Sequence, residues 1–274
     1  MQRLLDIENL RTTFDIHVGK VQAVRGVNLH VDEGETVGVV GESGCGKSVS
    51  MLSVLHLLPD YAKISADKMI FDGTDLTQLT PKMFRKISGD QIGMIFQDPM
   101  TSLNPLFTVG DQLTEPLRIH KGISKKEARD LVLEKLRMVE IPDPESRMKQ
   151  YPHELSGGMR QRAALIRTLI MEPTLLLLDE PFSALDYQTR LTVCNDICEI
   201  IRTNKKTAIL VTHDLAEAVS TGNRVLVLGK RPSTIKMELV FDPDFTTLSP
   251  LARRNHPLFN PYFQKLWEAF AHEK

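Results

Sequence analysis

Short apolar runs and amphipathic stretches follow one another along most of the chain. The apolar runs have the length of buried strands and stand between polar or turn-forming residues; they cover 37–40, 92–96, 175–178, 207–212 and 225–228. Residues with helical periodicity fill the intervals; they cover 48–58, 158–171, 188–202 and 215–221. Strands that alternate with helices predict an α/β fold with a mostly parallel core sheet.

Both ends and the middle of the chain depart from this alternation. Between 4 and 29, short apolar stretches around Gly19 and Gly26 predict antiparallel strands with turns at the two glycines. From 109 to 151 the periodicity is helical, which predicts an inserted helical subdomain. A last helix, 261–271, gathers apolar side chains on one face, and we expect that face to pack on the core or on another subunit rather than on a membrane. The face carries Phe263, Leu266, Trp267 and Phe270.

Composition excludes several classes of protein. The net charge of −1 gives no overall field that would attract nucleic acid or an anionic membrane. No apolar run approaches the ~20 residues of a membrane span, and the first residues lack the apolar stretch of a signal peptide. The three cysteines, Cys45, Cys194 and Cys198, are too few for a disulfide framework. We therefore expect a cytosolic, soluble protein that binds no nucleic acid.

Cys194 and Cys198 lie one helical turn apart and could in principle share a metal ion. No further cysteine follows them, and no histidine is spaced to complete a tetrahedral set. We interpret both as helix-packing residues, because free cysteine is often buried.

A complete phosphate-binding loop, or P-loop, follows the strand at 37–40. Its residues are Gly41, Glu42, Ser43, Gly44, Cys45, Gly46, Lys47 and Ser48. They match the pattern G-x4-G-K-S in its expected place between a strand and a helix. The glycines let the backbone wrap phosphates, Lys47 supplies charge to the β- and γ-phosphate oxygens, and Ser48 can ligate Mg²⁺. Cys45 is interpreted as a small side chain that fits the loop rather than a redox group.

Two carboxylates, Asp179 and Glu180, end the apolar strand at 175–178. The ends of strands in such sheets face the ligand crevice. Asp179 is therefore predicted to orient Mg²⁺, and Glu180 to act as the general base on the attacking water.

A second phosphate-binding signal stands at 155–161, which reads Leu-Ser-Gly-Gly-Met-Arg-Gln. A Ser-Gly-Gly turn that opens a basic helix offers backbone N–H groups and a helix N-terminus to an anion. The binding residues are Ser156, Gly157 and Gly158. Two such helix starts in one chain suggest that one nucleotide is held between two copies of it.

This combination of motifs resembles the ATP-binding cassette (ABC) family over nearly all 274 residues. The resemblance implies a P-loop NTPase (RecA-like) core with an N-terminal β part at 1–97 and 160–230. It also implies a helical subdomain with the signature motif at 98–159, and a C-terminal strand and amphipathic helix at 231–274. In this family the P-loop of one subunit faces the Ser-Gly-Gly turn of its partner, with ATP and Mg²⁺ between them.

The resemblance assigns further residues. Gln97 is similar to the Q-loop glutamine, which contacts Mg²⁺ or the lytic water, and His213 to the H-loop histidine, which contacts the γ-phosphate. Ser183-Ala184-Leu185-Asp186 resembles the D-loop, which crosses to the partner subunit. Phe14 stands where the family places the aromatic ring that stacks on adenine, although a phenylalanine also suits an ordinary strand.

Different parts of the chain resemble two different branches of the family. Up to the signature, 41–43, 97–105 and the long helical segment look like the peptide and nickel importer branch. After it, 179–190, 207–214 and 230–232 look like the nitrate, sulfonate and taurine branch. Either natural recombination or a mixed branch would produce this pattern.

The resemblance implies the ATP-hydrolysing subunit of an ABC importer, held at the cytoplasmic face of the cell membrane by two permease subunits and supplied by a solute-binding protein. The subunit would act as a homodimer or as a heterodimer with a related ATPase. Di- or oligopeptides, or nickel, are the expected solute, because the segments that contact permeases lie in the peptide-like part. A nitrate, sulfonate or taurine importer, a non-transport ABC ATPase and a P-loop kinase are the alternatives. The single cassette without heptads argues against the second of these, and the signature motif against the third.

Overall fold

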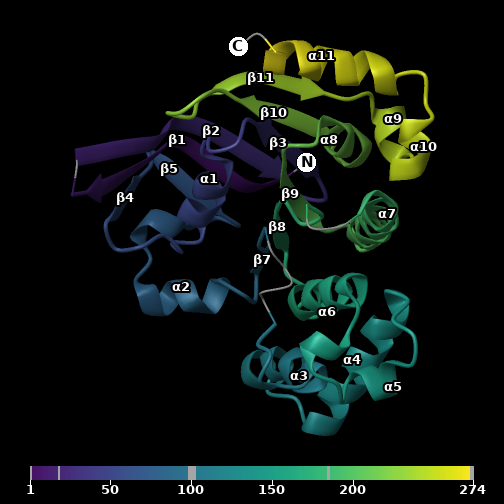
Figure 1. The fold of residues 1–274 in the computed structure, drawn as a ribbon. Coiled ribbons are helices and arrows are strands. Elements are labelled where there is room, and N and C mark those ends of the chain that lie inside the picture. The colour runs from purple at the N-terminus through teal and green to yellow at the C-terminus, as the bar shows by residue number, and fades with distance from the viewer. Residues whose placement is uncertain (1, 18, 98–102, 184–185, 272–274) are drawn as a thin grey trace.

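The computed structural model describes residues 2–17, 19–97, 103–183 and 186–271. Two sheets and the helices packed on them form one body, and a further group of helices projects from it below (Figure 1). The predicted α/β class is confirmed.

The core sheet has the strand order β11-β10-β3-β9-β8-β7. Its strands are β3 Thr36–Gly41, β7 Ile92–Ile95, β8 Leu175–Asp179, β9 Thr207–Thr212, β10 Arg224–Leu228 and β11 Ile235–Val240. All pair in parallel except β11, which is antiparallel to β10. The parallel strands match the predicted ones closely, and their side chains are buried on both faces, as the uninterrupted apolar runs require.

Different elements cover the two faces of this sheet. One face packs against helix α1 (Lys47–Val54) and the antiparallel sheet. The other face packs against helices from the later part of the chain, in two apolar clusters. These helices are α6 Gly157–Leu169, α7 Tyr187–Thr203, α8 Leu215–Thr221 and α11 Phe259–Ala271.

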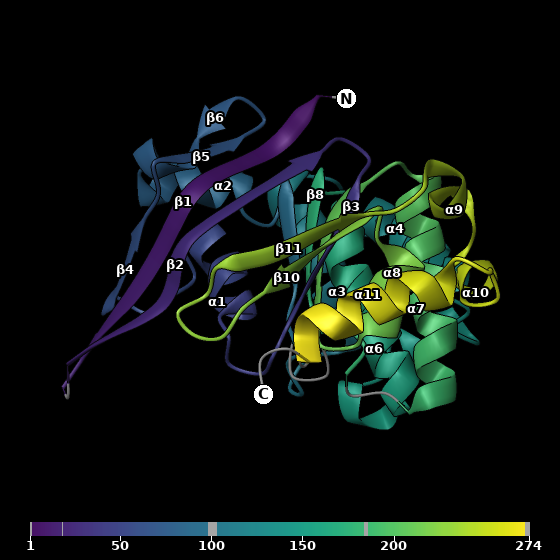
Figure 2. The same ribbon diagram turned by 90° about the horizontal axis from the view of Figure 1, so that it is seen from above.

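The antiparallel sheet is built on the long hairpin of β1 (Arg3–Ile16) and β2 (Gly19–Asp32), prominent in Figure 2. Strand β4 Ala62–Ser65 and strand β5 Lys68–Phe71 pair with β1, and β6 Thr74–Asp75 pairs with β5. Strands β4, β5 and β6 were not predicted from the sequence pattern.

The predicted turn at Gly26 is wrong. Gly26 lies inside β2, with φ +74°, where the register with β1 shifts between Leu10 and Arg11. A glycine with positive φ serves a bulge as readily as a turn, and the bulge keeps β2 continuous.

The predicted helix at 48–58 is too long, because α1 ends at Val54. His56 takes a left-handed conformation (φ +51°), and the N–H of Leu57 donates to the carbonyl of Leu52 at 3.0 Å. This is the bond pattern of a Schellman C-cap. A histidine rather than a glycine occupies the left-handed position, so the sequence carried no obvious stop signal before Pro59.

The helical part below the core has its own apolar cluster. It consists of α3 Val109–His120, α4 Lys125–Met138, α5 Pro144–Arg147, the short 3₁₀ turn Pro152–Glu154 and α6. Thr108, Ser124 and Ser156 cap α3, α4 and α6 through their hydroxyl groups. The predicted helical texture of 109–151 is therefore confirmed; the proposed boundaries of the subdomain stay a prediction.

The remaining helices are short or lie at the C-terminal end. They are the 3₁₀ turn Leu76–Gln78, α2 Pro81–Ile87, α9 Pro243–Thr247 and α10 Pro250–Arg254. In α11, Leu266 is fully buried against α8 and the edge of the core sheet, as predicted. Trp267 instead keeps 53% of its surface exposed and stacks on Phe263, with ring centroids 6.3 Å apart. In the described part of the chain, no helix is both long enough and apolar enough to cross a bilayer.

Candidate nucleotide site

The parallel core sheet brings the predicted site residues to one edge. The P-loop follows β3, Gln97 lies two residues after β7, Asp179 ends β8 and His213 follows β9. Because β7, β8, β9 and β3 are successive parallel neighbours, their carboxyl ends meet at the same edge.

The P-loop is closely packed by its own chain. Gly46 caps α1 with φ +107°, and a Cβ there would lie 2.9 Å from the carbonyl oxygen of Ala23 and 2.4 Å from Oγ of Ser233. A Cβ on Gly41 would lie 2.7 Å from Sγ of the buried Cys45, which agrees with a steric role for that small side chain. Both glycines are thus required by close approach.

Lys47 is held inside the loop. Its ammonium group donates to the carbonyl oxygens of Gly41 at 2.7 Å and Glu42 at 2.9 Å, and only 5% of the residue is exposed. Ser43 and Gly44 lie at the exposed outer turn of the loop. The positive charge is therefore fixed at the start of α1, where the helix dipole also favours an anion.

Ser48 and Asp179 are in direct contact across the sheet edge. The hydroxyl group of Ser48 donates to Oδ1 of Asp179 at 2.8 Å. Burial raises the pKa of the Asp179 carboxyl, and the charge of Glu180 raises it further, whereas the Ser48 hydrogen bond and Lys47 lower it. Such a carboxylate gains from a cation, because a nearby positive charge offsets the cost of burying it.

Glu180 contacts both other members of a second cluster, Gln97 and His213. Its Oε2 accepts a hydrogen bond from Nε2 of Gln97 at 3.3 Å and lies 3.1 Å from Nδ1 of His213. Its backbone is left-handed (φ +45°), a conformation that a residue with a Cβ adopts only when its surroundings enforce it. Predicted base, glutamine and histidine are therefore brought together on one carboxylate oxygen.

Thr212, Asp214 and Glu217 form a hydrogen-bonded network behind His213 that the sequence motifs did not predict. The hydroxyl of Thr212 accepts from the N–H of Asp214 at 3.0 Å and donates to the buried carboxyl of Glu217. Asp214 caps α8 and lies 3.8 Å from Arg190. Burial raises the pKa of Glu217 to about 7. The available signal in the sequence was Glu217 itself, an acid between the apolar residues of 215–219. The hydrogen bonds of Thr212 to Asp214 and Glu217 fix the backbone on both sides of His213.

The Ser-Gly-Gly turn stands apart from these clusters. Ser156 caps α6, accepting from the N–H of Met159 at 3.3 Å. A Cβ on Gly157 would meet no atom within 4 Å, and one on Gly158 only a methyl carbon of Thr189 at 3.4 Å. Within the described residues, no hydrogen bond links the turn to the P-loop cluster. The fold itself thus does not need a glycine at 157, although one is present.

Phe14 and Asp186 also have roles within their own chain. Phe14 is partly buried against the apolar core, with its ring centroid 6.0 Å from that of Tyr61. Asp186 caps α7, and the N–H of Thr189 lowers the pKa of its carboxyl. Residues 98–102 of the peptide-like segment and Ala184 and Leu185 of the D-loop lie outside the described residues.

The two helical cysteines pack as expected. Cys194 is buried in the cluster beneath α7, and Cys198 packs against it. In the described ranges, no group of three or more histidine, cysteine, aspartate or glutamate residues could hold a metal ion.

A P-loop, a serine–aspartate pair and a glutamate–glutamine–histidine cluster at one sheet edge, with a separate anion-binding helix start, define a P-loop nucleoside triphosphatase. The family model described as "ABC transporter" matches residues 24–183. The chain belongs to the ABC transporter family and is an ABC-type ATPase that binds ATP.

Curated relatives and solved structures agree with this assignment. The dipeptide transport ATP-binding protein DppD of Bacillus subtilis (strain 168) is 49% identical over 229 residues, 83% of this chain and 68% of that protein. The oligopeptide transport ATP-binding protein OppD of the same organism is 45% identical over 233 residues, 82% of this chain and 63% of that protein. A dimeric structure of MJ0796, a bacterial ABC transporter cassette, is 29% identical with a TM-score of 0.77, and covers 87% of this chain and 99% of its own. MJ0796 is also known in a post-hydrolysis state bound to ADP and Pi, with the same scores.

These relatives bear on the split between branches. Any uninterrupted stretch covering 83% of this chain includes the signature and residues on both sides of it. The prediction that the chain resembles the peptide branch is therefore confirmed, and the similarity extends beyond the signature. The resemblance of 179–190, 207–214 and 230–232 to the nitrate, sulfonate and taurine branch stays a prediction.

Proposed function

We propose that two copies of this chain, or this chain and a related subunit, enclose ATP between the P-loop of one and the Ser156–Gly158 turn of the other. The open space at Gly157 carries this proposal. A glycine that the fold does not require leaves room for a phosphate at the first turn of α6, where the backbone N–H groups point outward. The dimeric structure of the MJ0796 cassette supports it.

In the proposed site, Lys47 holds the β- and γ-phosphates and Glu180 accepts the proton of the attacking water. Gln97 and His213 already contact Oε2 of Glu180, so both can orient that oxygen toward water at the γ-phosphate. Phe14 would stack on adenine. Asp186 would approach the partner from the N-terminus of α7.

The residues Ser48 and Asp179 fit a magnesium ion. Ser48 offers a hydroxyl oxygen, Asp179 offers a buried carboxylate that a positive charge would stabilise, and Mg²⁺ prefers oxygen ligands. When bound, Mg²⁺ would neutralise charge on the phosphates. We assign Gln97, which follows β7 at the same sheet edge, as the third residue that would hold the ion.

We further propose that the chain drives the uptake of di- or oligopeptides through two permease subunits fed by a solute-binding protein, at the cytoplasmic face of the membrane. The names of the curated relatives support the solute. A nickel importer, or a nitrate, sulfonate or taurine importer, is the alternative that the branch patterns leave.

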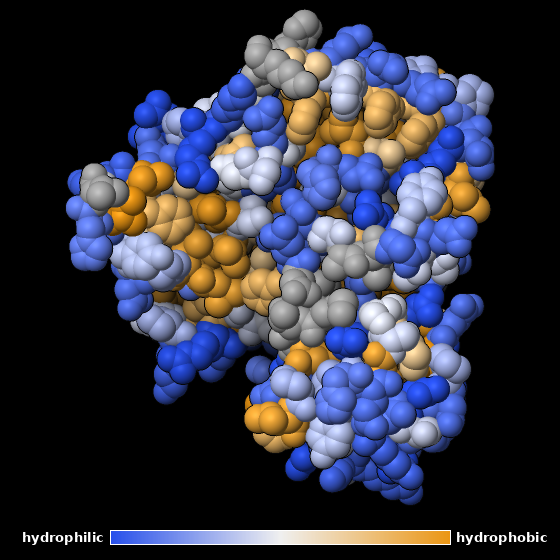
Figure 3. Space-filling model, in the orientation of Figure 1, coloured by the Kyte–Doolittle hydropathy of each residue, from blue (hydrophilic) through white to orange (hydrophobic). Residues whose placement is uncertain are grey.

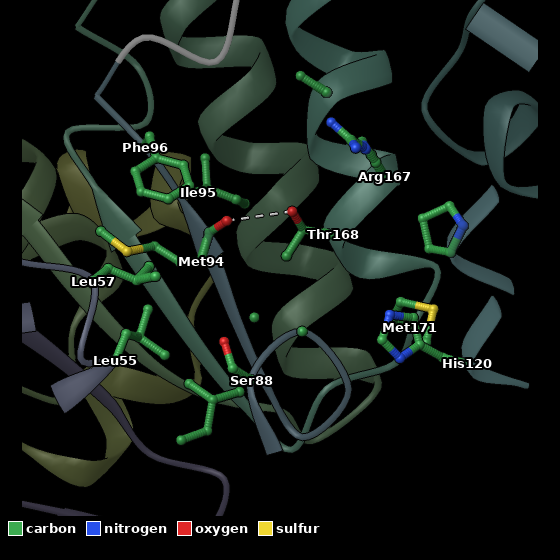
Figure 4. A pocket seen from close by; sticks show the side chains of 15 residues that line it. Leu55, Leu57, Ser88, Met94, Ile95, Phe96, His120, Arg167, Thr168 and Met171 are labelled. Atoms are coloured by element: carbon green, nitrogen blue, oxygen red, sulfur yellow. Dashed lines mark hydrogen bonds between the residues drawn. The ribbon is translucent and has the colours of Figure 1, made fainter. Parts of the chain in front are cut away.

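A cavity of about 290 Å³ is the proposed binding site for a permease segment. Figure 3 shows an indentation between the main body and the helices below it, and β7, α3 and α6 line the cavity there. Figure 4 shows Leu57, Met94 and Phe96 on one side and His120, Arg167 and Met171 on the other. An apolar wall facing basic side chains suits an amphipathic helix with an acidic end.

The test is ATP turnover by the purified chain and by its E180Q variant. We expect the variant to bind ATP normally while turnover falls at least about 100-fold, the usual range for loss of a general base. Turnover at the wild-type rate would refute the assigned base. Reconstitution with peptide permeases should make turnover depend on a peptide-loaded binding protein; dependence on nitrate- or taurine-type permeases would favour the alternative.

A further inference from the structure

The side chain of Gln161 joins the signature helix to the backbone beside the candidate base. Gln161 lies on α6, five residues after Ser156, and is completely buried. Its amide nitrogen donates to the carbonyl oxygen of Pro181, the residue that follows Glu180. One buried hydrogen bond thus connects the helix that begins at the Ser-Gly-Gly turn to the turn that carries Glu180.

That turn needs external support. Glu180 is left-handed at φ +45°, and its N–H donates to the carbonyl of Val211 at 2.8 Å. Its own carbonyl accepts from the hydroxyl of Ser183 at 2.9 Å. These contacts come from the sheet and from the turn itself, whereas the contact from Gln161 comes from α6. The position of α6 is therefore one of the constraints on the backbone of Glu180.

Packing alone does not explain a glutamine at this position. Oε1 of Gln161 is buried and has no hydrogen-bond partner among the described residues. A buried amide oxygen without a partner is unfavourable, and an apolar side chain of the same shape would avoid it. What only the glutamine provides is the N–H donor directed at Pro181.

We propose that Gln161 is a positioning residue that couples the two nucleotide sites of the dimer. When a phosphate binds at Ser156–Gly158, α6 settles in one position, and the Gln161–Pro181 bond transmits that position to Glu180 of the same subunit. The partner's ATP thereby sets the base that acts on this subunit's own ATP. The inference rests on the proposed ATP sandwich and on Glu180 as base.

The first measurement is ATP turnover as a function of ATP concentration for Q161M, an isosteric variant without the donor. We expect kcat to fall about 10-fold or more while KM changes less than about 2-fold. Q112M is the matched control: Gln112 is a buried glutamine of the helical part whose amide donates to the carbonyls of Asn104 at 2.8 Å and Phe107 at 3.0 Å. Q112M should keep kcat within about 2-fold. A wild-type kcat for Q161M, or equal losses in both variants, would overturn a positioning role.

The second measurement tests coupling in mixed dimers. One subunit carries E180Q, so ATP is hydrolysed only at the site that contains Glu180 of the other subunit. That other subunit is wild type, G157D, Q161M or the double variant G157D/Q161M. G157D leaves this active site intact and disturbs only the opposite one. If Gln161 transmits the effect, G157D should slow the active site in the wild-type background and have no further effect on Q161M.

Multiplicative losses in the double variant, or no effect of G157D alone, would overturn the coupling. Wild-type turnover by a dimer that carries E180Q in both subunits would instead contradict the proposed function. The two failures are therefore distinguishable.

Discussion

The P-loop cluster and the Ser-Gly-Gly turn both offer backbone N–H groups to phosphate, yet the chain treats them differently. Around the P-loop, Lys47, Ser48 and Glu180 already have partners within the chain. At the turn, a Cβ on Gly157 would meet no atom within 4 Å, and the hydroxyl of the cap, Ser156, accepts a hydrogen bond from the same helix. One half of the site is preorganised by the fold, and the other is completed by what binds to it. This difference is what a site shared between two subunits requires.

A substitution at Gly157 tests the difference between the two regions with the largest expected effect. G157D places a carboxylate where a phosphate is expected, so turnover should fall about 100-fold, the size of effect seen when one transition-state donor is lost. Because a side chain there meets no neighbour, the melting temperature should stay within about 2 °C, which corresponds to less than about 1 kcal/mol.

K125D is the control for G157D. It puts the same residue at the first position of α4, which Ser124 caps in the same way as Ser156 caps α6. Turnover should stay within about 2-fold of wild type. A G157D protein with full turnover would mean that the turn binds no phosphate.

A second prediction concerns the free energy of unfolding, which the buried carboxyl of Glu217 beside the preorganised half should lower at neutral pH. Burial raises the pKa of Glu217 to about 7 from 4.5, so the folded state holds its proton more tightly than the unfolded state. The free energy of unfolding should therefore decrease as pH rises from 4.5 to about 7, by up to about 3 kcal/mol, and stay level above. E217Q keeps an acceptor for Thr212 without the buried charge, and should be more stable than wild type at pH 8 but not at pH 4.

Denaturant unfolding at both pH values measures this difference. E134Q, on the exposed side of α4, is the control and should change the stability little at either pH. An E217Q protein that is less stable than wild type at pH 8 would show that the carboxylate is stabilised in place.

The smallest effect distinguishes the two roles of Asp186. D186A removes the cap of α7 and should cost about 1 kcal/mol, or about 2–4 °C in melting temperature. D186S restores a capping hydroxyl and should recover the melting temperature. If Asp186 also crosses to the partner, D186S will still weaken ATP-dependent dimerisation; dimerisation equal to wild type would restrict Asp186 to capping.

The sequence predicted the parts of the molecule that depend on local patterns. Lys47, Ser48, Asp179 and Glu180 stand in motifs a few residues long, and the parallel strands are short apolar runs. The end of α1 was missed because its left-handed residue is His56 and not a glycine. Gln161 was missed for another reason: its partner, the carbonyl of Pro181, comes close only because α6 packs on the sheet. Glu217, five residues after its partner Thr212, was missed although an acid between apolar residues was visible in the sequence.

Trp267 gives the protein a built-in optical probe. It is the one tryptophan of the sequence, and it stands half exposed on α11, stacked on Phe263. Helix α11 packs on α8, which starts two residues after His213. Indole emission of the unlabelled chain therefore comes from a single place. A change in that emission on adding ATP would report movement of α8 and α11, and an unchanged emission would confine the response to the sheet edge and α6.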